Sequence, residues 1–226
     1  MNKTVLVGTL IILFVAGLGI GVVSSSSLPQ SSSTVSTTVT TTTTQSASTS
    51  SSPFVLSLVI TTNNIYNATI EDQPAYYVLN QNGLQSSGNI SLPAHQLIKL
   101  VIVNYDDGAA NLTSPQYSNV AGTLNNVVTV VNNDNVNSSQ GTSGININGG
   151  ETVSNVSSDN IAHTFTVPQL NLNVPIPPSS TVTAYFTLNQ TGTFTWFCMT
   201  QCGSGANGTE GAMSTDAWMT GSIVVS

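Results

Sequence analysis

Charged side chains are scarce in this chain. Its 226 residues include no arginine and only two lysines, Lys3 and Lys99, so charged residues make up 5% and the formal net charge is −7. A soluble domain usually carries about a quarter charged residues. Because a chain this acidic and this poor in cations repels phosphate groups, we expect no nucleic-acid partner.

Histidine and cysteine are equally rare, which excludes several classes of enzyme. The chain has only His95, His163, Cys198 and Cys202, so zinc sites of the Cys₄ and Cys₃His kinds are excluded. It has no Gly-x-Ser-x-Gly elbow, and the glycine-rich stretch "GSGANG" lacks the lysine and the following helix of a phosphate-binding loop. We therefore expect no independent enzymatic activity.

The N-terminus carries a long apolar run. Residues 4–23, "TVLVGTLIILFVAGLGIGVV", are uncharged and about long enough to cross a bilayer. Lys3 on the short flank favours an N-terminus inside the cell, so residues 1–23 predict a single-pass anchor with the remaining chain extracytoplasmic. Cleavage of this segment as a signal peptide among the small residues 24–27 stays open as an alternative.

A serine- and threonine-rich tract follows the apolar run. Residues 24–53 cannot build a core, which predicts a disordered, O-glycosylated stalk. Beyond it, N-x-S/T sequons indicate a glycosylated exterior domain. The candidate asparagines are Asn67, Asn89, Asn111, Asn137, Asn155, Asn189 and Asn207.

Residues 54–226 are rich in β-branched and aromatic residues and show no helical pattern. Clusters of Asn, Gly, Pro and Ser separate short apolar segments, which predicts an all-β domain, an antiparallel sandwich or barrel. The long Asn/Gly/Ser-rich stretch of about 108–159 predicts a surface insertion. The expected strands are 54–61, 75–79, 97–104, 127–131, 163–167, 181–188, 192–199 and 221–225.

The C-terminal part gathers the residues that can bind a metal. His163, Cys198, Cys202, Met213 and Met219 offer an imidazole, two thiols and two thioethers. Soft sulfur ligands combined with imidazole select copper. The same residues have simpler interpretations, because a histidine can bond a carbonyl and methionines can pack beneath a loop.

This part of the chain resembles a cupredoxin. The stretch "DNIAHTFTVPQLNLNVPIPPSSTVTAYFTLNQTGTFTWFCMTQCG", followed by "WMTGSIVV", is similar to the ligand-bearing half of the periplasmic domain of cytochrome c oxidase subunit II. It is also similar to archaeal membrane-anchored cupredoxins of the sulfocyanin kind, and "LPAHQLIKLVIVNYDD" resembles an earlier strand of such domains. The resemblance implies a cupredoxin-like Greek-key β-sandwich. It also implies a copper-binding electron-transfer protein that serves a redox partner or a terminal oxidase.

Matched position by position, the resemblance implies four metal ligands. His163 takes the place of the first ligand, Cys198 and Cys202 that of the Cys-x-x-x-Cys pair of a binuclear copper centre, and Met219 that of the terminal methionine. A second histidine belongs between the second cysteine and the methionine, but "GSGANGTEGAMSTDAWM" contains none. Met213 and Asp216 are the possible additional ligands in this loop, although a carboxylate suits cuprous copper poorly.

Three alternatives stay open at this point. The two cysteines can form a small disulfide in a metal-free domain, or they can remain free thiols. A metal-free domain would resemble the subunit II of quinol-using oxidases, which has this fold without the copper centre. The stalk and the sequons would also suit a cell-surface adhesion or coat protein.

His95 is not expected to be a ligand. It should lie at the end of the domain opposite the predicted metal ligands, exposed in a turn.

Overall fold

The computed structural model describes residues 52–65, 73–132, 150–204, 208 and 210–226. The described residues form two β-sheets with five short 3-10 helices and no α-helix. The strands are β1 (Phe54–Thr61), β2 (Ala75–Asn80), β3 (Gly83–Ser86), β4 (Asn89–Leu92), β5 (Leu97–Asn104), β6 (Val128–Asn132), β7 (Glu151–Val153), β8 (His163–Val167), β9 (Leu172–Ile176), β10 (Ser180–Thr187), β11 (Gly192–Phe197) and β12 (Thr220–Val225). The 3-10 helices are Pro115–Ser118, Leu124–Asn126, Ser158–Asn160, Pro168–Leu170 and Gly211–Ser214.

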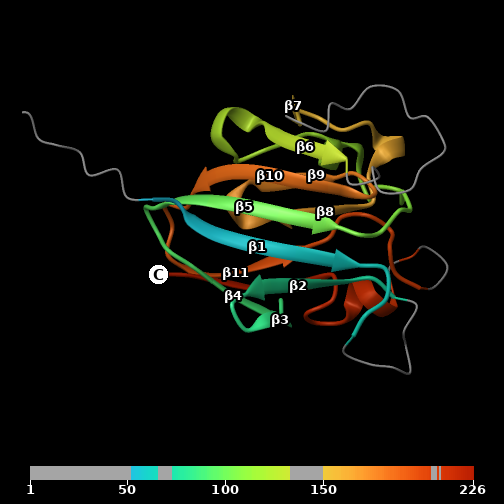
Figure 1. Ribbon diagram of the computed structural model, residues 1–226, viewed down its shortest axis with the longest axis horizontal. Coiled ribbons are helices and arrows are strands. Elements are labelled where there is room, and N and C mark those ends of the chain that lie inside the picture. The colour runs from blue at the N-terminus through green and yellow to red at the C-terminus, as the bar shows by residue number, and fades with distance from the viewer. Residues whose placement is uncertain (1–51, 66–72, 133–149, 205–207, 209) are drawn as a thin grey trace, which may run out of the picture. The chain divides into compact units, whose positions relative to one another are not determined.

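The strands form a seven-stranded and a five-stranded sheet. The first has the order β3-β2-β1-β5-β10-β6-β7, and Figure 1 shows β1, β5 and β10 side by side in it. The second has the order β4-β12-β11-β8-β9. Strand β1 runs parallel to β5, and β12 runs parallel to β4, so the expectation of a purely antiparallel sandwich was wrong. The β1–β5 pair is parallel because the chain passes through β2, β3 and β4 before it returns beside β1 as β5.

The core lies between the inward faces of the two sheets. In β5, Ile98, Leu100 and Ile102 are fully buried and alternate with partly exposed residues, as expected for a strand with one face on a core. Strand β12 shows the same alternation. Burying each such side chain contributes about 1.5–3 kcal/mol of transfer free energy, so the two apolar faces hold the sandwich together.

All eight segments predicted as strands contain a strand, with ends shifted by no more than two residues. The strands that the sequence did not predict are β3, β4, β7 and β9. Strand β9, "LNVPI", contains a proline, and β3, "GLQS", has neither alternation nor β-branched residues. The mostly β architecture follows from the sequence, whereas the shorter strands do not.

The described parts of the predicted insertion, residues 108–132 and 150–159, form backbone hydrogen bonds with the rest of the domain. The first residues of the insertion pair with the loop after β11: Leu112 forms a bridge with Thr200, and the Gln201 N–H donates to the Asn111 carbonyl over 2.7 Å. Its strand β6 pairs with both β10 and β7, so the expected strand is part of the large sheet. Hydrogen bonds between backbone groups cannot be predicted from the amino-acid composition of a segment.

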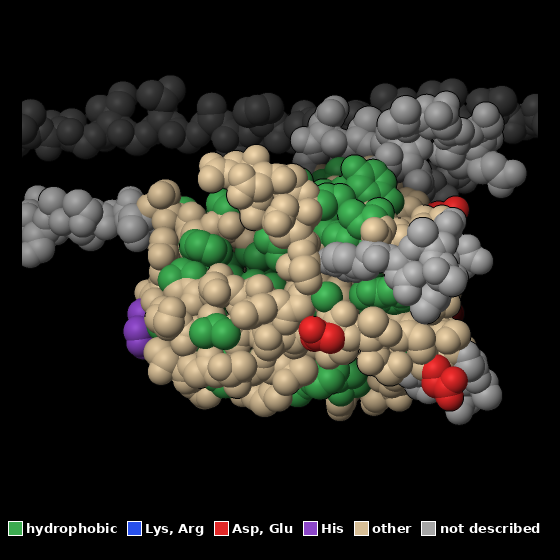
Figure 2. All heavy atoms as spheres, turned by 90° about the horizontal axis from the view of Figure 1, so that it is seen from below, with side chains coloured by type: hydrophobic (Ala, Val, Ile, Leu, Met, Phe, Trp, Pro, Cys, Tyr) green, Lys and Arg blue, Asp and Glu red, His purple; other side chains and the backbone are tan. Residues whose placement is uncertain are grey.

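Few of the described surface residues are charged, and nearly all of those are acidic. The face in Figure 2 shows mainly backbone and uncharged side chains with a few acidic groups, and no lysine or arginine. Lys99 is the only lysine or arginine within the described residues. The predicted anchor and nearly all of the predicted stalk lie outside these residues, and none of the described residues belongs to a helix that could cross a bilayer.

Candidate metal centre

The candidate site is assembled by two neighbouring strands of the five-stranded sheet. His163 is the first residue of β8, and Cys198 follows directly after β11. Strands β8 and β11 are paired, with Phe197 opposite Thr166, so their ends bring the imidazole beside the thiol. Cys202 lies four residues further on, in the loop that leads to β12.

Three of the four predicted ligands lie together. The Sγ atoms of Cys198 and Cys202 are 3.5 Å apart, and the Cys198 Sγ is 3.7 Å from Nδ1 of His163. The ligand atoms of all three residues lie within 4.8 Å of one another. Both cysteines are free thiols, and the sulfur separation exceeds the roughly 2.05 Å of a disulfide. His163 and Cys198 are buried, and Cys202 is half-buried.

Of the two methionines, Met213 places its sulfur next to a cysteine. Its Sδ lies 3.3 Å from Sγ of Cys202, and Met213 lies in the 3-10 helix Gly211–Ser214. Met219 is fully buried in the core and meets the site through its backbone, because its carbonyl accepts the Cys198 N–H over 2.8 Å. Asp216 is exposed and belongs to no cluster of potential metal ligands within the described residues.

Asp106 is a site residue that the sequence did not reveal. Its Oδ2 lies 2.9 Å from Nε2 of His163, on the far side of the ring from the thiols. Asp106 comes two residues after β5, and the backbone N–H of Asp106 donates to the side chain of Asn104 over 3.0 Å. The signal in the sequence is the Asn-x-Asp end of that strand, where a buried Asn104 holds the turn. Nothing in the sequence alone connects this turn to His163.

Two polar groups lie beside the Cys198 sulfur. The Thr164 N–H donates to it over 3.4 Å, and the Thr200 hydroxyl lies 3.1 Å away. The single Thr200 hydroxyl proton goes to the Ala162 carbonyl over 2.8 Å, so of these two groups the Thr164 N–H is the donor to the sulfur. Donors around a cysteine sulfur stabilise the thiolate, which is the form that binds metal.

The electrostatics of the site favour an imidazolium beside a thiolate in the metal-free protein. Burial alone would lower the pKa of His163, but the hydrogen bonds to Asp106 and to Cys198 outweigh it and raise that pKa to about 9. Burial opposes ionisation of Cys198 too, yet the bonds to Cys202 and His163 hold its pKa well below its usual value. The Cys202 pKa is raised well above its usual value because its proton bonds to Cys198 and because the residue is buried.

Aromatic side chains form the inner wall of the site. The Tyr76 ring meets His163 edge-on with 6.2 Å between centroids, and its hydroxyl donates to the Thr164 carbonyl over 3.0 Å. Burial, followed by the neighbouring cysteines, raises the pKa of Tyr76 well above its usual value. Trp196 packs 5.0 Å from Tyr76 and donates from Nε1 to the Ser87 carbonyl, so it is a core residue. The wall keeps water away from the buried side of the histidine.

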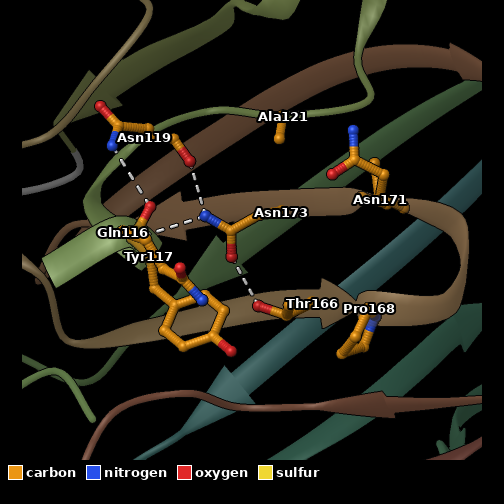
Figure 3. Close-up of a pocket in the computed structure, with 9 residues that line it drawn as sticks. Gln116, Tyr117, Asn119, Ala121, Thr166, Pro168, Asn171 and Asn173 are labelled. Carbon is orange, nitrogen blue, oxygen red and sulfur yellow. Dashed lines mark hydrogen bonds between the residues drawn. The ribbon is translucent and has the colours of Figure 1, made fainter. Parts of the chain in front are cut away.

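A separate pocket of about 310 Å³ lies at the β8–β9 edge of the five-stranded sheet (Figure 3). Its lining residues are uncharged, and Asn173 lies at its centre. The Asn173 amide donates to the carbonyls of Tyr117 and Asn119 and accepts from the Thr166 hydroxyl over 2.6 Å. The side chain therefore ties residues 117–119 to β9, and the pocket contains none of the predicted ligands.

The remaining predicted positions lie at the surface. His95 is exposed in a turn with a positive φ of 57°, as expected. Four of the seven sequon asparagines, Asn89, Asn111, Asn155 and Asn189, are described and exposed. The other three, Asn67, Asn137 and Asn207, lie outside the described residues. Exposure is required for glycosylation, which stays a prediction at all seven positions.

No family model matches the chain, and no curated protein sequence matches it. Among solved structures, a multicopper oxidase is 10% identical with a TM-score of 0.34, and the match covers 76% of this chain and 43% of that one. The periplasmic domain of cytochrome oxidase subunit II (CoxB) of Bradyrhizobium japonicum is 11% identical with a TM-score of 0.32, and the match covers 76% and 83%. Reduced rusticyanin is 13% identical with a TM-score of 0.30, and the match covers 78% and 82%.

The chain thus spans less than half the length of the multicopper oxidase it matches. The subunit II periplasmic domain, to which the sequence bears a resemblance, is among the solved structures similar to this chain. With TM-scores below 0.5, these similarities carry no argument about the site, whose chemistry rests on the distances given above.

Proposed function

We propose that this chain binds one copper ion between His163, Cys198 and Cys202 and uses it for electron transfer. The observation that carries the proposal is that the three potential ligand atoms lie within 4.8 Å of one another at the ends of paired strands. Bonds of about 2.0–2.3 Å to a tetrahedral ion place neighbouring ligand atoms about 3.3–3.8 Å apart. The separations of 3.5 and 3.7 Å fit a single ion in this range.

The donor set fits copper better than other metals of biology. Two thiolates and an imidazole are soft ligands, and copper stands highest in the order of affinities for such sites. Bound copper supplies a one-electron couple. The paired strands hold His163 and Cys198 in place, which limits the rearrangement between oxidation states. Met213 or Met219 would contribute the thioether, and the missing second histidine favours one ion over a binuclear centre.

The setting of the domain is part of the proposal. The apolar run of residues 4–23 would anchor the chain in the membrane, and the stalk would hold the copper domain on the outer side. The described sequons are exposed, which is compatible with a glycosylated exterior domain. The partner would be a redox protein or a terminal oxidase at the same membrane.

The test is copper loading of the reduced, full-length protein in detergent. We expect about one copper per chain by elemental analysis and a thiolate-to-copper absorption band that is absent in Cys198→Ser. The variant His95→Gln is the matched control, because that histidine is exposed and far from the cluster in sequence. A protein that binds no copper, or that holds only zinc after exposure to both metals, would contradict the proposal.

A second candidate function is a metal-free binding or structural domain with a Cys198–Cys202 disulfide. The 3.5 Å between the two sulfurs favours it, because a small movement would close the bond in an oxidising exterior. Mass spectrometry of protein isolated from its native membrane distinguishes the two functions. A mass 2 Da below that of the dithiol, combined with failure of the reduced protein to take up copper, would establish the metal-free function.

A further inference from the structure

We propose that Asp106 positions His163 to bind copper through Nδ1 and, through its negative charge, lowers the reduction potential of the bound ion. The inference rests on the proposed function, because it concerns the same site. It assigns a role to a residue that would not itself touch the metal.

The orientation of the imidazole follows from its two neighbours. Nε2 lies 2.9 Å from Oδ2 of Asp106, while Nδ1 faces Cys198. An ionised carboxylate only accepts hydrogen bonds, so Nε2 must carry a proton and the lone pair of Nδ1 is left for a metal. The ring is fully buried and meets Tyr76 edge-on, so a rotation would have to displace that side chain.

Asp106 is itself held in place. Its Oδ1 accepts the Gly108 N–H over 3.0 Å, and its Oδ2 faces His163, so both oxygens have partners. The Asp106 carbonyl accepts the Ser179 N–H over 2.8 Å, and the buried Asn104 bonds on to the Pro177 carbonyl. The carboxylate, although 20% exposed, therefore belongs to a fixed network and is not a mobile surface charge.

Few cations are present to compensate the charge of Asp106. Lys99 is the only lysine or arginine in the described part of the chain, and it precedes Asn104 by five positions on β5. Five residues of strand span about 17 Å, which exceeds the screening length of about 8–10 Å at physiological salt. The carboxylate therefore acts mainly on His163 and on whatever ion His163 binds. A negative charge stabilises the cupric ion more than the cuprous ion, which lowers the reduction potential.

The variants Asp106→Asn and Asp107→Asn distinguish the effect of the charge beside His163 from the effect of the net charge of the protein. Both remove one negative charge, and Asp107 is the exposed neighbouring residue. An amide oxygen in place of the carboxylate still accepts the Nε2–H, and water can bond the N–H of the exposed Gly108. Asp106→Ala removes the acceptor as well, so its loss of copper affinity, about 10–100-fold, reports the orienting role.

Voltammetry of the copper-loaded full-length protein measures the effect of the charge. In Asp106→Asn we expect the ratio of cuprous to cupric affinity to rise about tenfold, which moves the midpoint potential about 59 mV in the positive direction. Asp107→Asn should leave the potential nearly unchanged. Asp106→Ser, which is also neutral, replaces the Asn variant if the latter does not fold.

Nitrogen NMR of the cuprous, diamagnetic protein measures the orientation independently. In the His95→Gln background one imidazole remains, so its two ring nitrogens are assigned without ambiguity. We expect a proton on Nε2 and a coordination shift on Nδ1. Coordination through Nε2, or equal potentials for the Asp106→Asn and Asp107→Asn proteins, would overturn the inference. A wild-type protein that takes up no copper at all would instead refute the proposed function.

Discussion

The sulfur atoms of Cys198 and Cys202 lie 3.5 Å apart, at a separation that suits two ligands of one ion and is about 1.5 Å longer than a disulfide bond. The same pair can therefore bind a metal ion or form a disulfide, depending on whether copper or an oxidant reacts with it first. We expect the reduced, copper-free protein to show two titratable thiols and to lose both on mild oxidation, without forming dimers. Bound copper should protect both thiols. Thiol counting with mass spectrometry checks this, and retention of both thiols in the oxidised copper-free protein would contradict it.

The two methionines should respond differently to replacement by leucine. Met213 lies 3.3 Å from the Cys202 sulfur, whereas Met219 meets the site through its backbone. Because Leu is similar to Met in volume, each change should cost less than about 1.5 kcal/mol of stability. Met213→Leu should shift the absorption band and the midpoint potential, since a thioether tunes both. If Met219→Leu shifts them and Met213→Leu does not, Met219 is the thioether ligand.

Glycine at position 203 allows the loop after Cys202 to fold back on itself. A Cβ atom there would overlap the Glu210 carbonyl and lie 2.8 Å from Cγ of Met213. Gly203→Ala should therefore displace the loop, destabilise the protein by about 1–3 kcal/mol and weaken copper binding. Denaturant unfolding and copper competition measure the two effects. Unchanged stability and unchanged copper affinity in Gly203→Ala would contradict this prediction.

Stability of the metal-free protein should depend on pH through the His163–Asp106 pair. The native pKa of His163 is raised from 6.5, so its contribution is complete below pH 6.5 and is lost as the pH rises through the native value of about 9. The native pKa of Asp106 is lowered from 3.8, chiefly because the bond to His163 outweighs burial, so its contribution is lost as the pH falls below 3.8. The pair therefore stabilises most between about pH 4 and 6.5.

The thiols must be removed to observe this dependence. The lowered pKa of Cys198 contributes stability that increases with pH up to its unfolded value of 9.0, which opposes the loss from His163. In the double variant Cys198→Ser/Cys202→Ser, the free energy of unfolding should decline as the pH rises above 6.5. The decline should end below pH 9, because Cys198 no longer helps to raise the pKa of His163. Adding Asp106→Asn should flatten the curve. A profile unchanged by that substitution would show that the ion pair contributes nothing.

The larger strands are predictable from the sequence because they consist of β-branched and aromatic residues between turn formers. Strand β5, "LIKLVIVN", is an example, and its burial alternates as the pattern requires. Strand β9 escaped prediction because its proline and asparagine are unusual in strands; its edge is covered by a bridge between Ala121 and Asn173. That contact depends on tertiary structure and has no local signature.

The candidate site was only partly predictable. His163, Cys198 and Cys202 were chosen for their chemistry and for their resemblance to cupredoxin ligands, and the structure places them together. Asp106 was missed because it is 57 residues away from His163 in the chain, and a hydrogen bond between distant turns is not encoded in either local pattern. The closeness of Met213 to Cys202 depends on how the glycine-rich loop folds back, which composition alone does not specify.

The bond between the Asn111 carbonyl and the Gln201 N–H joins a sequon to the loop between the two cysteines. Asn111 is exposed, so a sugar attached there would lie at the surface next to this loop. If the chain transfers electrons as proposed, we expect a glycan at this asparagine to slow exchange with a partner that docks at this loop. A change in glycosylation would then alter how easily a partner binds to this loop without altering any metal ligand.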